Sequence, residues 1–77
     1  MKELLEFIVK SAVENPQDVA IVESEEEGSV FLKIKVNPED LKIIIGKEGK
    51  TIRAIREVMK IPATKLNKRV RVEIEEV

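Results

Sequence analysis

Hydrophobic and polar positions follow two different periods along the chain. Near the N-terminus, apolar side chains recur at the spacing of one α-helical stripe. They are Leu4, Leu5, Ile8, Val9, Ala12 and Val13. We expect this helix to end near Asn15, because Pro16 disfavours helical geometry in the residue before it.

Two strand-like runs follow the helix. Residues 19–22 form a short β-leaning run, and residues 29–36 alternate between outward positions and the apolar positions Val30, Leu32, Ile34 and Val36. This alternation predicts a half-buried strand. The polar residues 25–28, three glutamates and a glycine, lie between the runs and predict the turn of a β-hairpin.

The second half of the chain predicts two helices and a strand. Asn37 can cap a helix, Pro38 suits its first turn, and the following acidic residues favour its positive end. This short helix begins at Pro38, continues over residues 41–45 for barely two turns and ends at Gly46. We expect the next helix over residues 50–60, stopped by Pro62, then a loop over residues 63–68 and a strand over residues 69–75.

The predicted order of elements is therefore α-β-β-α-α-β. A chain of 77 residues is long enough for one domain, residues 1–77, and no more. The apolar stripes of the helices need a common surface to cover, so we expect them on one face of the sheet. This is an α+β arrangement.

The charge of the chain is strongly asymmetric, although its net charge at pH 7 is only −1. Residues 41–71 carry ten basic and two acidic residues, a net charge of +8, whereas the remainder carries four basic and thirteen acidic residues, or −9. The basic residues of this segment are Lys42, Lys47, Lys50, Arg53, Arg56, Lys60, Lys65, Lys68, Arg69 and Arg71. Such a segment indicates an anionic partner, although a solvated helix face is the alternative for any single residue.

Composition argues against most catalytic and metal chemistry. The chain has no Cys and no His, which removes disulfides, thiolate ligands, the usual zinc site and the commonest general base. We therefore expect no enzyme, no cofactor and no metal. No apolar run approaches the roughly 18–20 residues that span a membrane, and Glu6 interrupts the N-terminal apolar stretch, which argues against a signal peptide. We expect a cytoplasmic protein without a membrane partner.

A glycine motif joins the two helices of the basic segment. It reads Ile44-Ile45-Gly46-Lys47-Glu48-Gly49-Lys50-Thr51-Ile52. Two glycines allow a tight turn whose main chain can approach a sugar-phosphate backbone, and the following helix start favours anions. We expect Ile45 and Ile52 to hold the two helices against the sheet. A plain helix–helix turn is the alternative, whereas a nucleotide-hydrolysing P-loop would need glycine where Ile44 stands.

The motif and the order of elements together resemble a type II KH domain, which implies a three-stranded mixed sheet with three helices on one face. Within that fold, the chain is similar to the small bacterial single-KH proteins of the KhpA family. The similarity covers the chain length, the Leu-rich first helix, the acidic hairpin and the segment Pro38-Glu39-Asp40-Leu41. It implies an RNA chaperone or adaptor that pairs with itself or with a larger Jag-type KH protein, and a role in cell elongation or cell-wall homeostasis.

The resemblance also implies a groove for about four nucleotides of single-stranded RNA. One wall comprises the two helices and their loop, and the other comprises the last strand and the loop before it. The implied RNA-binding residues are Lys42, Ile43, Ile45, Gly46, Lys47, Glu48, Gly49, Lys50, Arg53, Lys65, Lys68, Arg69 and Arg71.

Three residues complicate this hypothesis. Lys42 stands where many KH domains have glycine, and it either crowds the groove or contacts a phosphate. Glu48 places an acid inside the loop, at a Coulomb cost of about 1 kcal/mol near a phosphate in water. Phe31 lies on the polar side of its strand, where it covers a helix end or marks a partner surface. Its distance from the glycine loop in sequence argues against a stacking role. The alternative function is a KH-fold dimerisation module without RNA binding.

Overall fold

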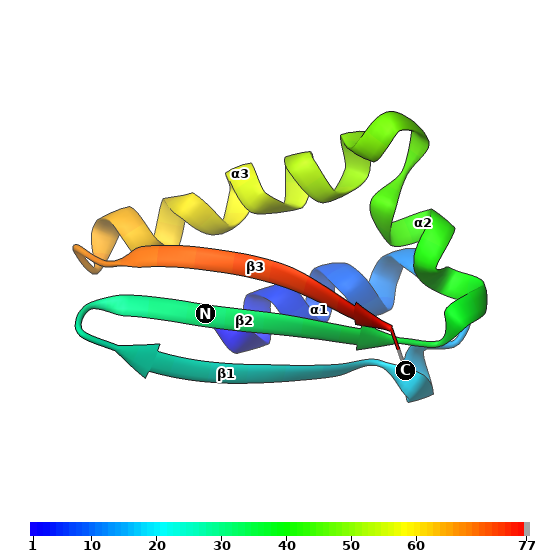
Figure 1. Ribbon diagram of the computed structural model, residues 1–77, viewed down its shortest axis with the longest axis horizontal. Helices are drawn as coiled ribbons and strands as arrows, with labels where there is room; N and C mark the ends of the chain where they lie inside the picture. The colour runs from blue at the N-terminus through cyan, green and yellow to red at the C-terminus, as the bar shows by residue number, and fades with distance from the viewer. Residues whose placement is uncertain (77) are drawn as a thin grey trace.

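The computed structural model (Figure 1) describes the backbone of residues 1–76 and the side chains of residues 1–75. Its helices and strands confirm the predicted α-β-β-α-α-β order. They are α1 (Lys2–Ala12), β1 (Ala20–Glu26), β2 (Ser29–Val36), α2 (Leu41–Ile45), α3 (Lys50–Lys65) and β3 (Arg69–Glu76). Short 3-10 turns lie at Pro16–Asp18, Pro38–Asp40 and Lys47–Gly49.

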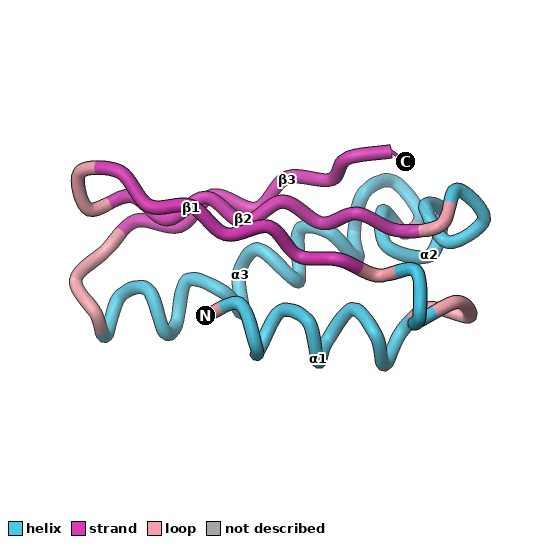
Figure 2. The backbone as a smooth tube through the Cα atoms, turned by 90° about the horizontal axis from the view of Figure 1, so that it is seen from below, coloured by secondary structure: helices cyan, strands magenta, loops and turns pink. Residues whose placement is uncertain are grey.

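The strands form one mixed sheet in the order β1-β2-β3. β1 runs antiparallel to β2, and β3 runs parallel to β2. Figure 2 shows the helices gathered on one side of this sheet, so the predicted α+β fold, with three helices on one face of a mixed sheet, is confirmed. Among the described residues, no helix has both the length and the apolar character to cross a membrane.

The core lies between this sheet and the helices. Val30, Leu32, Ile34 and Val36 of β2 are all buried, as their alternation predicts. They form one cluster with side chains from every helix. These are Leu5 and Val9 of α1, Ile44 of α2, and Ile52, Ile55 and Met59 of α3. The central strand is therefore the surface that all three helices cover.

The residue that holds α2 in the core is Ile44, not Ile45 as the sequence suggests. Ile44 is fully buried, Ile43 is half-buried, and Ile45 is 41% exposed. Consecutive helical residues point in directions about 100° apart, so one member of the triplet faces the sheet and its neighbours cannot. The expectation for Ile52 is confirmed, since this side chain is buried.

The hairpin turn is shorter than predicted, because β1 continues into the acidic run. Glu25 pairs with Val30 and Glu26 with Ser29, so only Glu27 and Gly28 form the turn. Both have positive φ, 49° and 79°, as a two-residue type I′ turn requires. Strand pairing thus extends over residues whose composition alone favours a turn.

The third helix continues through Pro62, contrary to the prediction that it stops there. α3 spans Lys50–Lys65, so residues 63–65, predicted as loop, are helical. A proline inside a helix removes one hydrogen bond and costs about 3 kcal/mol. Met59, three residues before Pro62, and Ala63, directly after it, are both buried, and burial of this apolar side of the helix offsets the cost.

The true end of α3 is a Schellman motif. Asn67 adopts a left-handed conformation with φ 56°, and its N–H donates to the Thr64 carbonyl at 3.0 Å. The Lys68 N–H donates to the Ala63 carbonyl at 2.8 Å. The Lys68 ammonium then forms an ion pair with Glu25 at 2.8 Å. This contact fastens the entry to β3 to the end of the β-hairpin.

A buried carboxylate joins the first half of the chain to the second. Asp40, 1% exposed, accepts hydrogen bonds from the Glu14 N–H at 3.1 Å, the Asn15 N–H at 3.0 Å and the Asn15 side-chain amide at 3.2 Å. The sequence suggests a helix-dipole role for Asp40. The structure adds that it holds the segment after α1 against the start of α2. The predicted cap at Asn37 is confirmed, since its Oδ1 accepts from the Glu39 N–H at 2.9 Å.

We predict that Asp40→Asn lowers the free energy of unfolding by about 1–3 kcal/mol. The substitution replaces one carboxylate oxygen by a donor that faces buried N–H groups, and an unsatisfied buried donor carries that cost. Chemical denaturation measures the change. The matched control is Glu39→Gln, the same kind of change at the exposed neighbouring position, which should shift stability by less than about 0.5 kcal/mol. Equal effects of the two substitutions would contradict this role for Asp40.

Candidate nucleic-acid interface

The loop between α2 and α3 is a tight reversal built on left-handed backbone conformations. Gly46 has φ 76° and ψ 172°, Glu48 has φ 57° and ψ 26°, and Gly49 has φ 75° and ψ 15°. The Gly49 N–H donates to the Gly46 carbonyl at 3.1 Å and closes the turn. The conformation at Gly46 is open almost only to glycine, and glycine adopts all such geometries at little steric cost.

Gly46 has a second constraint, which is its contact with the helix that follows. A Cβ built at this position would lie 2.6 Å from the Thr51 Cβ and 2.7 Å from the Thr51 backbone nitrogen. A Cβ built at Gly49 would meet no atom within 4 Å. The first glycine of the motif is therefore required by backbone conformation and by packing, and the second by backbone conformation alone.

Arg53 stabilises the loop from the first turns of α3. Its Nη2 donates to the Glu48 carbonyl at 2.7 Å and its Nε to the Gly49 carbonyl at 3.3 Å. These two bonds hold the carbonyls of the left-handed residues. The side chain remains exposed, so Arg53 both shapes the loop and places positive charge beside it.

A groove of about 460 Å³ lies between α3 and β3. The helix contributes Arg53, Arg56, Glu57 and Lys60, and the strand contributes residues 70–73. The Arg56 Nε donates to the Val72 carbonyl at 3.1 Å, so this side chain ties the helix to the strand. Four cations and two acids line the groove, and one acid, Glu57, is already paired with Lys60 at 2.9 Å. The groove therefore suits an anionic ligand.

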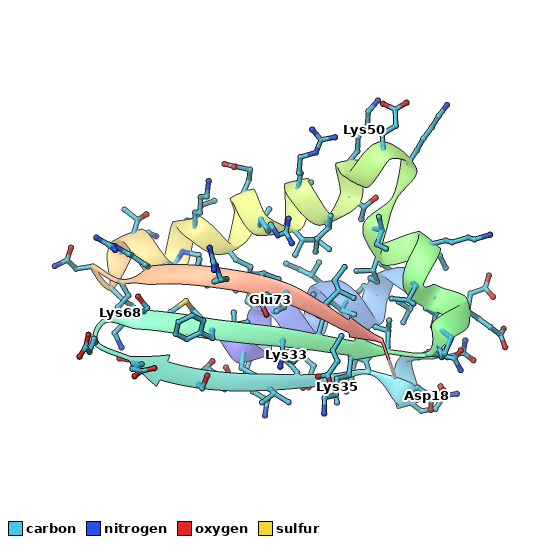
Figure 3. All side chains as sticks on the ribbon, in the orientation of Figure 1. Asp18, Lys33, Lys35, Lys50, Lys68 and Glu73 are labelled. Atoms are coloured by element: carbon cyan, nitrogen blue, oxygen red, sulfur yellow. The ribbon has the colours of Figure 1, made fainter. Side chains whose placement is uncertain are left out.

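The structure brings only some of the predicted residues into this groove. Arg53 and Arg71 line it from opposite walls, and the loop Gly46–Gly49 leads directly into the helix that forms one wall. Lys50 stands at the start of α3 and points away from the sheet (Figure 3). Arg69 lines a neighbouring hollow on the sheet with Arg71.

Other predicted residues lie outside the groove lining. Lys42, Ile43 and Ile45 belong to α2, which contributes no side chain to it. Lys65 ends α3, and Lys68 is engaged by Glu25. Their contact with a ligand remains a prediction.

Sequence reasoning missed two cations of the groove, Arg56 and Lys60, as site residues. Both appear in the basic segment, but neither belongs to the implied RNA-binding set. A signal was available, because positions 53, 56, 57 and 60 have the spacing of one helical face. That face carries three cations, and it is the face that borders β3.

Comparison with known proteins adds family information to this geometry. A family model described as the KH domain of KhpA/KhpB matches residues 2–74. An RNA-binding protein KhpA of Clostridium perfringens is 51% identical over 74 residues, which cover 96% of this chain and 99% of the relative. Another, from Caldanaerobacter subterraneus, is 43% identical with the same coverage.

Solved structures show the same fold within larger proteins. A crystal structure of Aquifex aeolicus Era bound to GDP and aluminium fluoride has a TM-score of 0.63 at 23% identity, covering 97% of this chain. An Era complex with nucleotides 1506–1542 of 16S ribosomal RNA has a TM-score of 0.62 at 22% identity, covering 99%. This chain spans less than a third of either Era chain. The likeness fits the type II KH arrangement.

We predict that Gly46→Ala destabilises the protein more than Gly49→Ala. At Gly49 the added methyl group carries only the left-handed backbone penalty, about 1–2 kcal/mol. At Gly46 it carries a backbone penalty and also meets Thr51, so we expect about 3 kcal/mol or more. Thermal and chemical unfolding measure both variants. Equal losses at the two positions would contradict the close packing of Gly46 on Thr51.

Proposed function

Since the chain belongs to the family of KhpA/KhpB KH domains, we propose that it binds single-stranded RNA in the groove between α3 and β3. The loop Gly46–Gly49 holds the sugar-phosphate backbone at one end of that groove. The observation that carries this proposal is the cationic lining of the groove, which begins within one turn of the loop. Relatives 51% identical to this chain carry the name RNA-binding protein KhpA, which supports the same ligand.

The physical basis is charge and close approach rather than catalysis. Arg53, Arg56 and Arg71 provide guanidinium groups that suit phosphate oxygens, and the N-terminal end of a sixteen-residue helix favours anions. Gly46 and Gly49 leave the loop without side chains at two of its four positions. We propose that Lys47 and Lys50 add charge at the backbone, that Ile43 and Ile45 contact bases, and that Lys42, Lys65 and Lys68 border the path.

We predict that Lys47→Asp and Glu48→Asp together weaken single-stranded RNA binding by at least about tenfold. The double variant adds negative charge where the loop meets phosphates. It should keep the fold, because aspartate tolerates the left-handed conformation of residue 48 better than most residues do. Fluorescence anisotropy with labelled RNA measures affinity, and circular dichroism checks the fold.

The chain provides a matched control at Lys2-Glu3, the other place in the sequence where a glutamate directly follows a lysine. Lys2→Asp with Glu3→Asp makes the same charge change on the first turn of α1, away from the groove. RNA affinity should stay within about twofold, because the added charge lies outside the proposed contact. If the loop variant and this control behave alike, the loop is not the RNA contact.

We further propose that the protein works in pairs, either as a homodimer or with a larger Jag-type KH protein. One groove for about four nucleotides binds weakly, and a second linked site raises affinity by effective concentration. Exposed apolar side chains near the end of α3 support a protein contact. Val58 is 41% exposed, Ile61 59% and Leu66 57%.

We predict that Ile61→Glu shifts self-association toward monomer, because a charge in an apolar contact loses its hydration. Sedimentation velocity over a range of protein concentrations measures the shift, and at least about a tenfold weaker association is expected. Thr64→Glu is the control, since Thr64 is an exposed polar residue of the same helix. A monomer at all concentrations without substitution would count against the homodimer and leave the heterodimer.

The second candidate function is a dimerisation module without RNA binding, and the same exposed apolar side chains favour it. Self-association without measurable RNA affinity would select this function. Within the RNA-binding proposal, we place the protein in the cytoplasm as a non-enzymatic RNA chaperone or adaptor built from a single KH domain. A role in cell elongation or cell-wall homeostasis belongs to the same proposal. Crosslinking RNA to the protein in cells, followed by sequencing, separates the RNA-binding function from the dimerisation module.

A further inference from the structure

No element of the part of the chain that the structure describes covers the face of the sheet opposite the helices. Figure 2 shows all helices on the other side, and Figure 3 looks onto the open face, where Lys33, Lys35 and Glu73 are labelled. Alternation along each strand assigns twelve side chains to it. They are Ala20, Val22, Ser24 and Glu26 of β1, Ser29, Phe31, Lys33 and Lys35 of β2, and Arg69, Arg71, Glu73 and Glu75 of β3.

Phe31 lies at the centre of one half of this face. In the sheet register it stands between Ser24 of β1 and Arg71 of β3. It lines two adjoining hollows, one with Ser29, Arg69 and Arg71, and one that includes Val22 and Arg71. Its side chain remains accessible, since the residue is 38% exposed. An aromatic ring with a guanidinium on its flank is thus presented to solvent.

Charges differ between the two halves of the face. Lys33 and Lys35 both lie 3.9 Å from the Glu75 carboxylate, so the lysines at one end already have a partner. Among residues 1–75, no carboxylate lies within ion-pair distance of Arg69 or Arg71. Within the described part of this face, the cations next to Phe31 are therefore the ones without a carboxylate partner, which suits them to an anionic ligand.

The open face is continuous with the proposed RNA groove. Arg71 and Glu73 line the groove between α3 and β3, and they also line the hollow that holds Phe31. A strand of RNA in the groove can therefore cross the outer edge of β3 and reach Phe31 without leaving the protein surface. The groove and the hollow beside Phe31 therefore have two lining side chains in common.

We propose that Phe31, with Arg69 and Arg71, forms a stacking platform for a base of single-stranded RNA that extends beyond the groove. This inference rests on the proposed RNA-binding function. Base stacking on an aromatic ring is tolerant of sequence, and the adjacent guanidinium groups suit the phosphate that links the stacked base to the groove. The platform lengthens the RNA path without a second domain.

The composition of the face favours RNA over a protein partner. Among the twelve described positions of this face, Phe31 and Val22 are the only large apolar side chains, whereas seven positions are charged. Protein interfaces are depleted in charge at their centres and bury about 800 Å² on each partner. One aromatic ring among arginines instead matches the pattern of single-strand binders, in which rings stack on bases and cations hold the backbone.

The test compares two RNA lengths with the full chain. Fluorescein-labelled RNA of randomised sequence, about four and about twelve nucleotides long, is titrated with protein, because the groove holds about four nucleotides. Phe31→Ala should weaken binding of the longer RNA about tenfold and leave the shorter RNA unchanged. The matched control is Phe7→Ala, which removes the other phenylalanine of the chain, 70% exposed on α1, and should change neither affinity.

A second substitution guards against loss of fold in the alanine variant. The chain contains no tryptophan, so Phe31→Trp introduces a single fluorescent reporter while it keeps an aromatic surface. Affinity should be retained, and the longer RNA should quench the fluorescence while the shorter one does not. Equal quenching by both RNAs, or none, would overturn the platform.

The remaining outcomes separate this inference from the function on which it rests. If both RNAs bind and the loop variant weakens them, but Phe31→Ala does not affect the longer one, the groove stands and the platform is wrong. If Phe31→Ala instead disrupts self-association in sedimentation, the face is a protein interface and the platform is likewise wrong. If neither RNA binds the unmodified protein, the proposed function itself fails.

Discussion

Parallel pairing of β2 with β3 is the constraint on which the rest of the structure depends. Two parallel neighbouring strands cannot be joined by a tight turn, so the chain must run back along the whole length of β2 before β3 begins. The eight residues of β2 span about 26 Å, and the sixteen residues of α3 span about 24 Å. A helix that ended at Lys60 would cover only about 16 Å. By continuing through Pro62, α3 itself covers most of the return along β2.

The same constraint accounts for the loop at the far end of the sheet. The chain leaves β2, forms only five helical residues in α2, and must then reverse before α3 can run back. Left-handed conformations at Gly46, Glu48 and Gly49 achieve this reversal within four residues, and Arg53 holds two of the loop carbonyls. A structural need thus places exposed, glycine-rich main chain at the start of the helix that lines the groove. The site proposed for RNA is a consequence of the crossover itself.

Local patterns predicted most of the fold, because strand alternation, helix capping and glycine turns act over a few residues. The alternation of β2, the cap at Asn37 and the helix end at Gly46 all follow from neighbours in sequence. The errors lie where distant residues decide. Glu25 belongs to a strand because it pairs with β2 and forms an ion pair with Lys68. Asp40 is buried because the segment after α1 packs against it and donates hydrogen bonds to it. The residues around Pro62 do not show how far the helix between β2 and β3 extends, so its continuation to Lys65 could not be predicted locally.

The candidate site likewise has a part that sequence neighbours determine and a part that distant residues determine. The loop could be predicted because Gly46 and Gly49 are diagnostic of a backbone geometry. The lining of the groove could be predicted only in part, because helical spacing places positions 53, 56, 57 and 60 on one face of α3 but does not show that this face borders β3. Arg56 illustrates this, since its bond to the Val72 carbonyl exists only in the folded register. Phe31 is similar, because its neighbours Ser24 and Arg71 are set by strand pairing on both sides.

A domain of this size has two physical routes from a small groove to a useful affinity. One is to continue the RNA path over β3, so that contiguous nucleotides add contacts within one copy of the chain. The other is to pair two grooves, so that separated nucleotides bind two copies and affinity rises by effective concentration. The first route saturates once the RNA covers the groove and the open face, whereas the second gains only when the RNA is long enough to span both copies. The dependence of affinity on RNA length therefore distinguishes an extended surface from a paired one, even where both contribute.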